Sequence, residues 1–361
     1  MKNSVVKTFG ILTSGGDAPG LNAAIRGVAR TAIDEYGMRV IGIEEGYRGL
    51  IEGKTHELKA ENFSGILTQG GTVLGISREK PFKNPIKDSI TGLTPVESIK
   101  KNYKALGLDA LVVLGGNGTN TTGKLLHDEG LNIIGLPKTI DNDLPETDIT
   151  FGFHSAVDVA TQAIDRLHST AHSHNRIIII EVMGHKAGWL ALYAGVAGGG
   201  DVILIPEIPY HIDSIASHLK RRQEQGKNFS IVVVAEGALS EQEALMDKKK
   251  FKQSRKNMTH SVAYRIAEEL KTATGLEPRV TVLGYVQRGG IPSSYDRVLA
   301  TQFGVKAAHM LARGEFGNMV VYKDNKTDFV PLDCIAGRIK RVPSDNNILL
   351  AGKSVGTCFG E

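Results

Sequence analysis

The sequence is short of the residues that mark secreted and membrane proteins. It has two cysteines in 361 residues, Cys334 and Cys358, and their spacing fits neither a metal site nor a disulfide framework. No apolar stretch approaches the length of a membrane-spanning helix, and the first residues, MKNSVVKTFGIL, lack the apolar core of a signal peptide. We therefore expect a cytoplasmic protein that has no membrane partner.

The sequence also has little excess charge of either sign. The 43 Lys and Arg residues against 39 Asp and Glu residues leave a net charge of +4, which does not predict a nucleic-acid partner. Acidic small molecules such as phosphates remain possible ligands. The densest basic run is KKKFKQSRK at 248–256, which is typical of a solvated helix or loop face, although binding of a polyanion is the alternative.

Short apolar segments that end in glycine or polar residues recur along the chain. The first runs from Lys7 to Thr13 and is followed by SGGDAPG and then by apolar residues at helical spacing. Similar segments are ALVVLGGNGTN at 110–120, NIIGLPKTIDND at 132–143, RIIIIEVMGHKAG at 176–188, DVILIPE at 201–207, SIVVVAEGA at 230–238 and RVTVLGYVQRGG at 279–290. Near-continuous apolar strands predict parallel sheets buried on both faces, with ligands at the carboxyl ends of the strands. The pattern predicts an α/β fold.

The length of the chain exceeds what one compact core usually supports, so we expect two α/β lobes, although one large domain is possible. A boundary near residue 150 is predicted where TIDNDLPETDITFGF leads into a long helical pattern. We expect residues 1–150 to form one lobe, to which residues 275–315 return, and residues 151–274 to form the other. The placement of residues 316–361 is left open.

Two glycine loops are candidates for binding phosphate. Gly15 and Gly16 lie between a predicted strand and a predicted helix, where backbone amides can approach an anion and the helix dipole favours negative charge. GGNGT at 115–119 is a second such loop, in which Asn117 can offer an amide oxygen to a magnesium ion or its water. Tight turns without a ligand are the alternative, because SGGDAPG matches neither the P-loop nor the dinucleotide fingerprint. Two loops in one half of the chain favour a polyphosphate site, with a dinucleotide as the rival ligand.

The stretch PKTIDND at 137–143 concentrates chemistry at a strand end. It places the carboxylates of Asp141 and Asp143, the cation of Lys138 and the hydroxyl of Thr139 within seven residues. A carboxylate can take the proton of a sugar hydroxyl as the oxygen attacks phosphorus, and a lysine can offset charge on the transferred group. An ordinary turn rich in Asx residues is the alternative.

Cations follow at later strands: Arg176, His185, Lys186, Arg279 and Arg288. Guanidinium groups bind phosphate through two hydrogen bonds, so converging arginines would recognise a sugar phosphate, although any single one is more often a surface residue. Glu236 ends an apolar strand, where its carboxylate can accept hydrogen bonds from sugar hydroxyls or form a structural ion pair.

Taken together and in order, these motifs resemble the 6-phosphofructokinases. They are LTSGGDAPGLNAAIRG, GGTVLGISR, GGNGT, PKTIDND, EVMG and VLGYVQRGGIPSSYDR, and they extend over residues 7–310. The resemblance implies two Rossmann-like three-layer α/β/α lobes with mainly parallel sheets, usually in a homotetramer. It also implies glycolytic transfer of the γ-phosphoryl group of ATP, with Mg²⁺, to the 1-hydroxyl of fructose 6-phosphate. Residues 1–150 would then hold the donor and residues 151–274 the sugar phosphate.

The resemblance assigns each site residue a role. The donor would be bound by Gly16, Arg78, Glu79, Gly116, Asn117, Gly118 and Thr119, with Asn117 near the magnesium ion. Asp141 would be the catalytic base, with Lys138, Thr139 and Asp143 placing the reacting groups. Fructose 6-phosphate would be held by Thr139, Ile140, Asp141, Arg176, Met183, Gly184, His185, Glu236, Arg279, Tyr285 and Arg288. Arg176 and Arg279 would reach the 6-phosphate from a neighbouring subunit.

Three residues depart from the family pattern. Asn117 stands where relatives commonly have an aspartate, His185 where many have an arginine, and Tyr285 where many have a histidine. The amide of Asn117 lacks the charge of an aspartate, so a metal ion there would rely more on water and donor oxygens.

Two residues give opposite indications of the phosphoryl donor. Gly118 is typical of the ATP users, because a bulky acid would occupy the space of the α-phosphate, whereas Lys138 is typical of the pyrophosphate users. The sequence favours ATP, because a lysine can coexist with a nucleotide.

Other functions stay open at this point. A pyrophosphate-dependent phosphotransferase would keep the fold and the acceptor, and an inactive sugar-phosphate-binding subunit would explain Asn117 and His185. Intact Lys138, Asp141 and Asp143 disfavour the inactive subunit. The missing GxGxxG disfavours a dinucleotide-dependent oxidoreductase.

Overall fold

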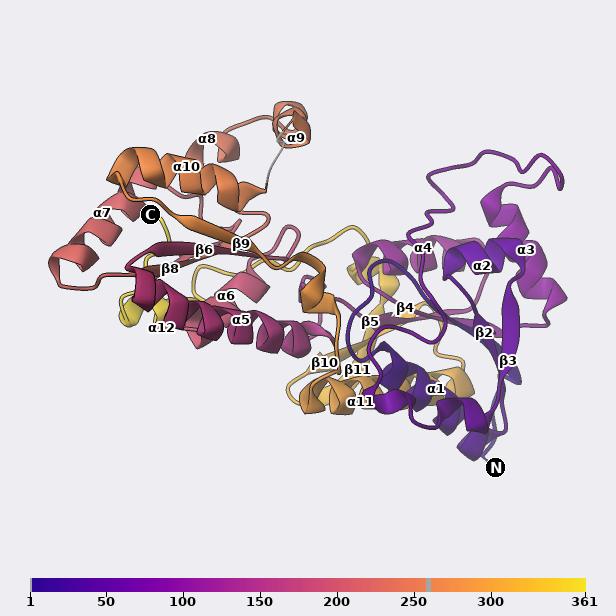
Figure 1. The fold of residues 1–361 in the computed structure, drawn as a ribbon. Coiled ribbons are helices and arrows are strands. Elements are labelled where there is room, and N and C mark those ends of the chain that lie inside the picture. Colours follow the sequence, from indigo (N-terminus) through magenta and orange to yellow (C-terminus); the bar gives the residue numbers. More distant parts are fainter. Residues whose placement is uncertain (1, 258–260) are drawn as a thin grey trace. The chain divides into compact units, whose positions relative to one another are not determined.

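The computed structural model describes residues 2–257 and 261–361. The chain divides into two compact units (Figure 1). The first unit contains residues 1–140, 144–155 and 288–339, and the second contains residues 141–143, 156–287 and 340–361. The chain thus returns to the first unit at Arg288, whereas the sequence suggested a return near residue 275.

The first unit is built on a seven-stranded sheet of order β11-β10-β5-β4-β1-β2-β3. Its strands are β1 (Thr8–Thr13), β2 (Arg39–Ile43), β3 (Thr55–Leu58), β4 (Ala110–Gly115), β5 (Ile133–Pro137), β10 (Asn318–Lys323) and β11 (Lys326–Pro331). The five inner strands are parallel, and the two edge strands β3 and β11 pair antiparallel with their neighbours. Strands β4 and β5 are buried at every residue, as expected for a sheet covered on both faces.

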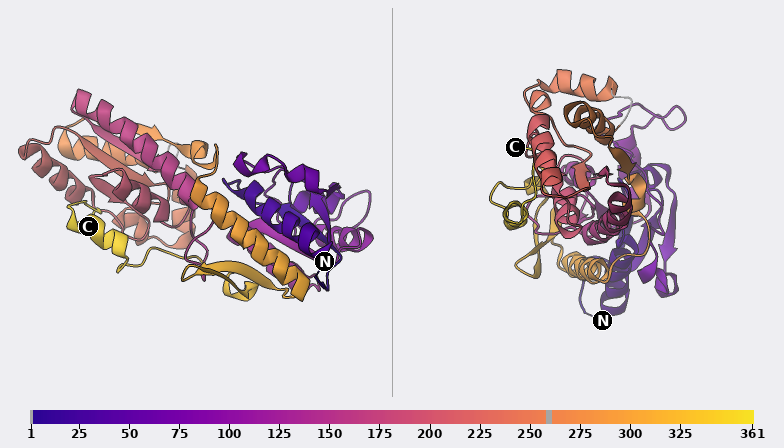
Figure 2. Two further views of the ribbon diagram at one scale, coloured as in Figure 1. Left: turned by 90° about the horizontal axis from the view of Figure 1, so that it is seen from below. Right: turned by 60° about the vertical axis from the view of Figure 1, so that its left-hand side comes forward.

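Helices cover both faces of this sheet. They are α1 (Leu21–Tyr36), α2 (Tyr47–Glu52), α3 (Pro95–Ala105), α4 (Asn117–Asp128) and α11 (Ser294–Arg313), with the short 3₁₀ helices η1 (Ala60–Phe63), η2 (Ile66–Thr68) and η4 (Leu332–Cys334). Figure 1 shows α1 and α11 on one face and α2, α3 and α4 on the other. Helix α1 runs alongside α11, as Figure 2 also shows. The arrangement is a three-layer α/β/α sandwich.

The second unit has a four-stranded, fully parallel sheet of order β7-β8-β6-β9. Its strands are β6 (Ile177–Val182), β7 (Val202–Leu204), β8 (Ser230–Ala235) and β9 (Arg279–Val282). The helices are α5 (Phe153–His174), whose first residues belong to the first unit, α6 (Trp189–Ala197), α7 (Ile212–Glu224), α8 (Glu241–Ala244), α9 (Lys248–Asn257), α10 (Val262–Thr274) and α12 (Asn347–Ser354), with the 3₁₀ helix η3 (Gly284–Arg288). The apolar faces of α7 and α10 pack on one side of the sheet, where Ile215, Leu219, Ile266 and Leu270 join its core.

The predicted α/β fold with mainly parallel sheets is confirmed, because each apolar segment that ends in glycine contains a parallel strand. The C-terminal residues, whose placement the sequence left open, divide between the units: β10 and β11 extend the first sheet, and α12 belongs to the second unit. In the described part of the chain, no helix combines the length and apolar character needed to cross a bilayer.

Candidate active site

Three neighbouring strands of the first unit carry the predicted donor residues. Strands β1, β4 and β5 are adjacent and parallel, so the loops that follow them emerge at one edge of the sheet. These loops hold Gly16, GGNGT at 115–119 and PKTIDND at 137–143. The structure therefore brings together three motifs that are far apart in the sequence, since Gly16 and Lys138 are separated by 122 residues.

Positive charge converges on Gly16. The Lys138 ammonium donates a hydrogen bond to the Gly16 carbonyl oxygen, and the Lys138 side chain is buried. The Arg288 guanidinium lies against the same glycine so closely that a Cβ atom at residue 16 would stand 1.5 Å from Arg288 Nη1. A side chain at residue 16 would displace this guanidinium. Two cations thus adjoin a loop that leads into α1, where an anion is favoured.

Arg78 and Glu79 lie next to this loop. The Gly15 amide donates to the Ser77 carbonyl oxygen at 2.9 Å, and Ser14 pairs with Ser77 as a short parallel bridge. This pairing holds the following two residues beside the glycine loop, with Arg78 exposed and Glu79 half-buried.

The second glycine loop starts helix α4. Gly116 precedes the helix, and Asn117, Gly118 and Thr119 form its first turn, where backbone N–H groups have no partner within the helix. Thr119 is buried, whereas a Cβ atom at Gly118 would meet nothing within 4 Å. Open space at Gly118 is compatible with a bulky donor beside the helix start.

Asn117 is engaged by a segment that the sequence did not connect with it. Its side-chain amide donates to the carbonyl oxygen of Arg338, and its Oδ1 accepts from the Gly337 amide at 3.3 Å. Thr121 Oγ1 lies 2.8 Å from the Asn117 carbonyl oxygen and 3.2 Å from Oδ1, within hydrogen-bond distance of both. The segment around Gly337 and the Thr121 hydroxyl together fix the orientation of the Asn117 side chain.

PKTIDND at 137–143 continues β5 into the second unit. Lys138, Thr139, Asn142 and Asp143 are buried, and Asp141 is half-buried. Asn142 has a left-handed backbone with φ of 49°, and its Oδ1 accepts from Lys340 Nζ at 3.0 Å. The backbone carbonyl of Asp143 accepts from the Lys340 amide at 2.8 Å, so the C-terminal segment fixes the turn that carries Asp141.

The predicted sugar-phosphate residues come partly together in the second unit. Strands β8, β6 and β9 are adjacent and parallel, and a pocket of about 210 Å³ lies at their carboxyl ends. Its lining includes Met183, Glu236 and Tyr285, each from the end of a different strand. Gly184 and His185 form the turn after β6, where the His185 amide donates to Glu236 Oε1 at 2.8 Å.

The pocket also contains Glu181, which the sequence analysis missed. Its Oε2 accepts from the Ala263 amide at 2.8 Å, at the start of α10. Burial raises the pKa of Glu181, the Ala263 N–H lowers it, and the nearby Glu236 carboxylate raises it further. A single carboxylate inside the apolar run IIIIEVMG was the signal that could have identified this residue.

Arg176, Arg279 and Arg288 do not line this pocket. Arg176 precedes β6 and Arg279 begins β9, so both stand at the amino ends of parallel strands, the edge opposite to the pocket. Arg279 pairs with Glu277 at 3.3 Å, and Arg176 lines a separate pocket of about 240 Å³ with Lys227. Arg288 lies against Gly16 in the first unit.

Glycine-rich loops and buried or apposed cations at the carboxyl ends of parallel strands define an α/β phosphate-binding protein. The sequence model of the phosphofructokinase family matches residues 8–311. The chain belongs to the phosphofructokinase family.

Individual relatives agree with this membership. An "ATP-dependent 6-phosphofructokinase" from Spirochaeta thermophila is 61% identical over the whole length of both chains. A protein of the same name from Propionibacterium freudenreichii is 52% identical over 98% of this chain and 99% of the relative. Among solved structures, phosphofructokinase from Saccharomyces cerevisiae has a TM-score of 0.77 and 35% identity, covering 91% of this chain and 45% of the yeast chain. The chain thus spans less than half of the yeast protein.

Proposed function

We propose that the protein is an ATP-dependent 6-phosphofructokinase, which transfers the γ-phosphoryl group of ATP to the 1-hydroxyl of fructose 6-phosphate and gives fructose 1,6-bisphosphate in glycolysis. The observation that carries the proposal is the 61% identity, end to end, with a relative of that name. The clustering of the three glycine and lysine loops at one sheet edge supports it from the structure.

The donor phosphates would be held by the loops after β1 and β4. Backbone amides at Gly16 and at the start of α4 would bind phosphate oxygens, with Arg78 and Glu79 beside the first loop. The Lys138 ammonium, buried next to Gly16, would offset the negative charge on the transferred group. The open space at Gly118 supports a nucleotide as donor.

Asp141 would act as the base. Its carboxylate would take the proton of the sugar 1-hydroxyl while that oxygen forms its bond to the γ-phosphorus and the bond to the β-phosphate oxygen breaks, releasing ADP. Thr139, Ile140 and Asp143 flank it and would place the reacting groups. Met183, Gly184, His185, Glu236 and Tyr285 would hold the sugar, because the structure gathers Met183, Glu236 and Tyr285 at one pocket.

Magnesium fits this site with few protein ligands. Within residues 2–257 and 261–361, no group of three or more His, Cys, Asp or Glu side chains is arranged to hold a metal. Asn117 lies in the first turn of α4 beside the glycine loop, so its Oδ1 would hold the ion or a metal-bound water, with the donor phosphates supplying other oxygens. The ion would supply neutralisation of phosphate charge during transfer.

A homotetramer in the cytoplasm completes the proposal. Arg176 and Arg279 lie at the edge of the sheet opposite to the sugar pocket of their own chain, which supports their reaching the 6-phosphate bound by a neighbouring copy. Light scattering should then give about four times the monomer mass of 38.8 kDa. A monomer with full activity would contradict this part of the proposal.

Pyrophosphate is the second candidate donor, because the Lys138 side chain is buried beside Gly16. Purified protein should be assayed with fructose 6-phosphate and each donor in turn. Turnover with ATP and little or none with pyrophosphate is expected, and turnover with pyrophosphate alone would refute the ATP assignment. Binding of fructose 6-phosphate without turnover by either donor would indicate an inactive subunit.

A further inference from the structure

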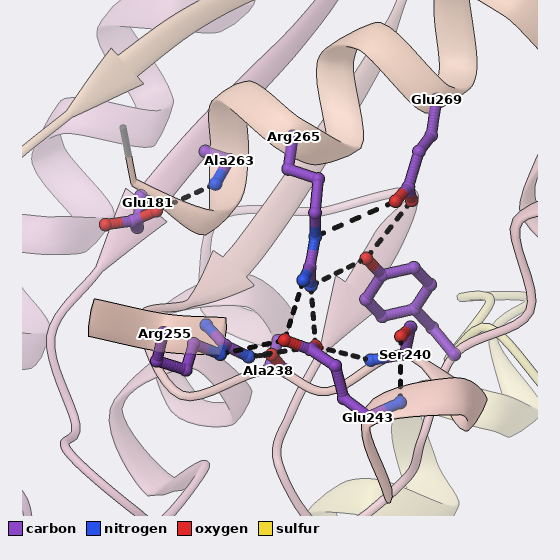
Figure 3. A network of polar contacts seen from close by, with 9 residues as sticks. Glu181, Ala238, Ser240, Glu243, Arg255, Ala263, Arg265 and Glu269 are labelled. Atoms are coloured by element: carbon purple, nitrogen blue, oxygen red, sulfur yellow. Dashed lines mark hydrogen bonds and ion pairs between the residues drawn. The ribbon is translucent and has the colours of Figure 1, made fainter. Parts of the chain in front are cut away.

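The basic run 248–256 forms helix α9, and one of its cations differs from the rest. The side chain of Lys250 is 81% exposed, as expected for a solvated helix face, whereas that of Arg255 is 17% exposed. Figure 3 shows the Arg255 side chain turned toward Ala238 and Glu243. Burying a guanidinium is unfavourable unless it is paired and hydrogen-bonded, so the contacts of Arg255 must offset its loss of hydration.

Arg255 holds the loop that follows β8. Its Nη2 donates to the carbonyl oxygen of Ala238 at 2.5 Å and to Glu243 Oε2 at 3.1 Å, and its Nε lies 2.9 Å from Glu243 Oε1 (Figure 3). Ala238 is fully buried and is two residues beyond Glu236, the carboxylate at the sugar pocket.

The guanidinium is itself fixed by a buried network. Glu243 is 5% exposed, and its Oε2 also accepts a hydrogen bond from Arg265 Nη2 at 2.7 Å. Its Oε1 forms an ion pair with Arg265 Nη1 at 2.7 Å. Ser240 and Glu243 cap helix α8 reciprocally, and Arg265 donates further to Tyr210 Oη at 3.1 Å. Burial would raise the pKa of Glu243, but the bonds from Arg265 and Ser240 and the Arg255 charge hold it below its usual value.

The other side of the loop is held by the turn after β6. The Glu236 amide donates to the Val182 carbonyl at 2.8 Å, and Glu236 Oε1 accepts from the His185 amide at 2.8 Å. A Cβ atom at Gly237 would stand 2.2 Å from the His185 carbonyl oxygen, so this turn and the loop are in close contact. The short span 236–238 is therefore clamped between β6 and Arg255.

We propose that Arg255 is a positioning residue for Glu236, so that the basic helix α9 sets the affinity of the site for its sugar-phosphate acceptor. The inference rests on the proposed function, because it assumes that Glu236 contacts the acceptor. Arg255 acts through the Ala238 carbonyl, and it does not itself line the pocket. If Ala238 is released, Glu236 can adopt more orientations. Acceptor binding must then restrict Glu236, and the entropy lost in doing so weakens the affinity for the acceptor.

The test compares Arg255→Met with Arg255→Lys and with Lys250→Met, a matched removal of an exposed cation from the same helix. Arg255→Met should raise KM for fructose 6-phosphate about tenfold, with KM for ATP unchanged and kcat within about twofold. Arg255→Lys should lie between, because an ammonium can donate to Ala238 but cannot present the fork that also holds Glu243. Lys250→Met should behave as the unmodified protein.

A double variant of Arg255 and Glu236 distinguishes positioning from a general structural role. The KM increases of Arg255→Met and Glu236→Gln should not multiply in the double variant, because both disturb the same contact. Equal rises in KM for both substrates, or a large drop in kcat, would indicate general damage and overturn the positioning role. Circular dichroism melts of each variant accompany the kinetics.

Two failures are distinguishable. If the unmodified protein neither binds nor phosphorylates fructose 6-phosphate, the proposed function fails and this inference fails with it. If the unmodified protein does both and Glu236→Gln weakens binding, an unchanged KM and binding constant in Arg255→Met would overturn the inference alone. An unchanged KM in Glu236→Gln would also overturn it, because no acceptor contact would remain for Arg255 to position.

Discussion

The Lys138 ammonium donates a hydrogen bond to the backbone carbonyl oxygen of Gly16, so a residue after β5 holds the loop after β1. The lysine is 3% exposed, and its burial is sustained by this bond and by the polar loop around it. Lys138 thus holds the glycine loop, and it would also stand beside the transferred phosphoryl group. Its removal should therefore affect both the stability of the fold and the rate of transfer.

Lys138→Met should lower both stability and turnover. The Gly16 carbonyl loses its partner, which costs about 1–3 kcal/mol of unfolding free energy, and we expect kcat to fall about a hundredfold because the transferred charge is no longer offset. Thermal melts and steady-state kinetics measure the two effects. Lys101→Met, at an exposed position of α3, is the control, and a Lys138→Met protein with normal kcat would show that the lysine is structural only.

Asp141→Asn should remove turnover while leaving binding. An amide cannot take the proton of the sugar hydroxyl, so kcat should fall at least about a thousandfold with little change in fructose 6-phosphate binding by calorimetry. The exposed Asp345→Asn should have no effect on either quantity. Near-normal turnover in the Asp141 variant would refute the role of this carboxylate as the base.

Gly118→Asp should select against ATP. A Cβ atom at this position would meet nothing within 4 Å, so the fold should tolerate the change. A carboxylate there would repel and crowd the nucleotide phosphates. We expect an increase of about tenfold or more in KM for ATP, an unchanged melting temperature and relatively improved use of pyrophosphate. Unaltered KM for ATP would place the nucleotide elsewhere.

Glu181→Gln should stabilise the protein at neutral pH. Burial raises the pKa of Glu181 above its ordinary value of 4.5, so the folded state binds a proton more tightly than the unfolded state. Stability therefore falls as pH rises from 4.5 through the folded pKa. Glutamine keeps an acceptor for the Ala263 amide without this dependence. The melting temperature of the variant should exceed that of the unmodified protein at pH 7 and approach it near pH 4.5.

The exposed Glu224→Gln serves as the matched control for that experiment. It should leave the pH dependence of the melting temperature unchanged, because it changes a surface carboxylate and disturbs no buried contact. A Glu181 variant that melts lower than the unmodified protein at pH 7 would contradict the destabilising effect of the buried charge.

Much of the fold could be predicted because its signals are local. Strands β1, β4 and β5 appear in the sequence as short, mainly apolar runs followed by glycine or polar residues, since a parallel sheet buried on both faces favours apolar residues along each strand. The hairpin of β10 and β11 was not predicted. Residues of β11 are exposed or half-buried, so their pattern lacks the apolar continuity of the inner strands.

The sequence identified those residues of the candidate site that lie in loops directly after strands. Gly16, Asn117 and Lys138 were identified from their motifs, and the adjacency of β1, β4 and β5 brings those loops to one edge. The hydrogen bonds from Asn117 to the carbonyl oxygens of Ile335 and Arg338 could not be predicted. They join segments 218 or more residues apart, and every residue has a backbone carbonyl, so no sequence motif marks them.

The sequence by itself determined the strands, the glycine loops and the family, because these depend on apolar continuity and on runs of neighbouring residues. Only the tertiary structure decided which charges meet: Arg255 is one of several cations in a basic run, yet it alone among those described in α9 is paired with Glu243. Pairing depends on distances between side chains from separate elements, and those distances are set when the sheets and helices pack.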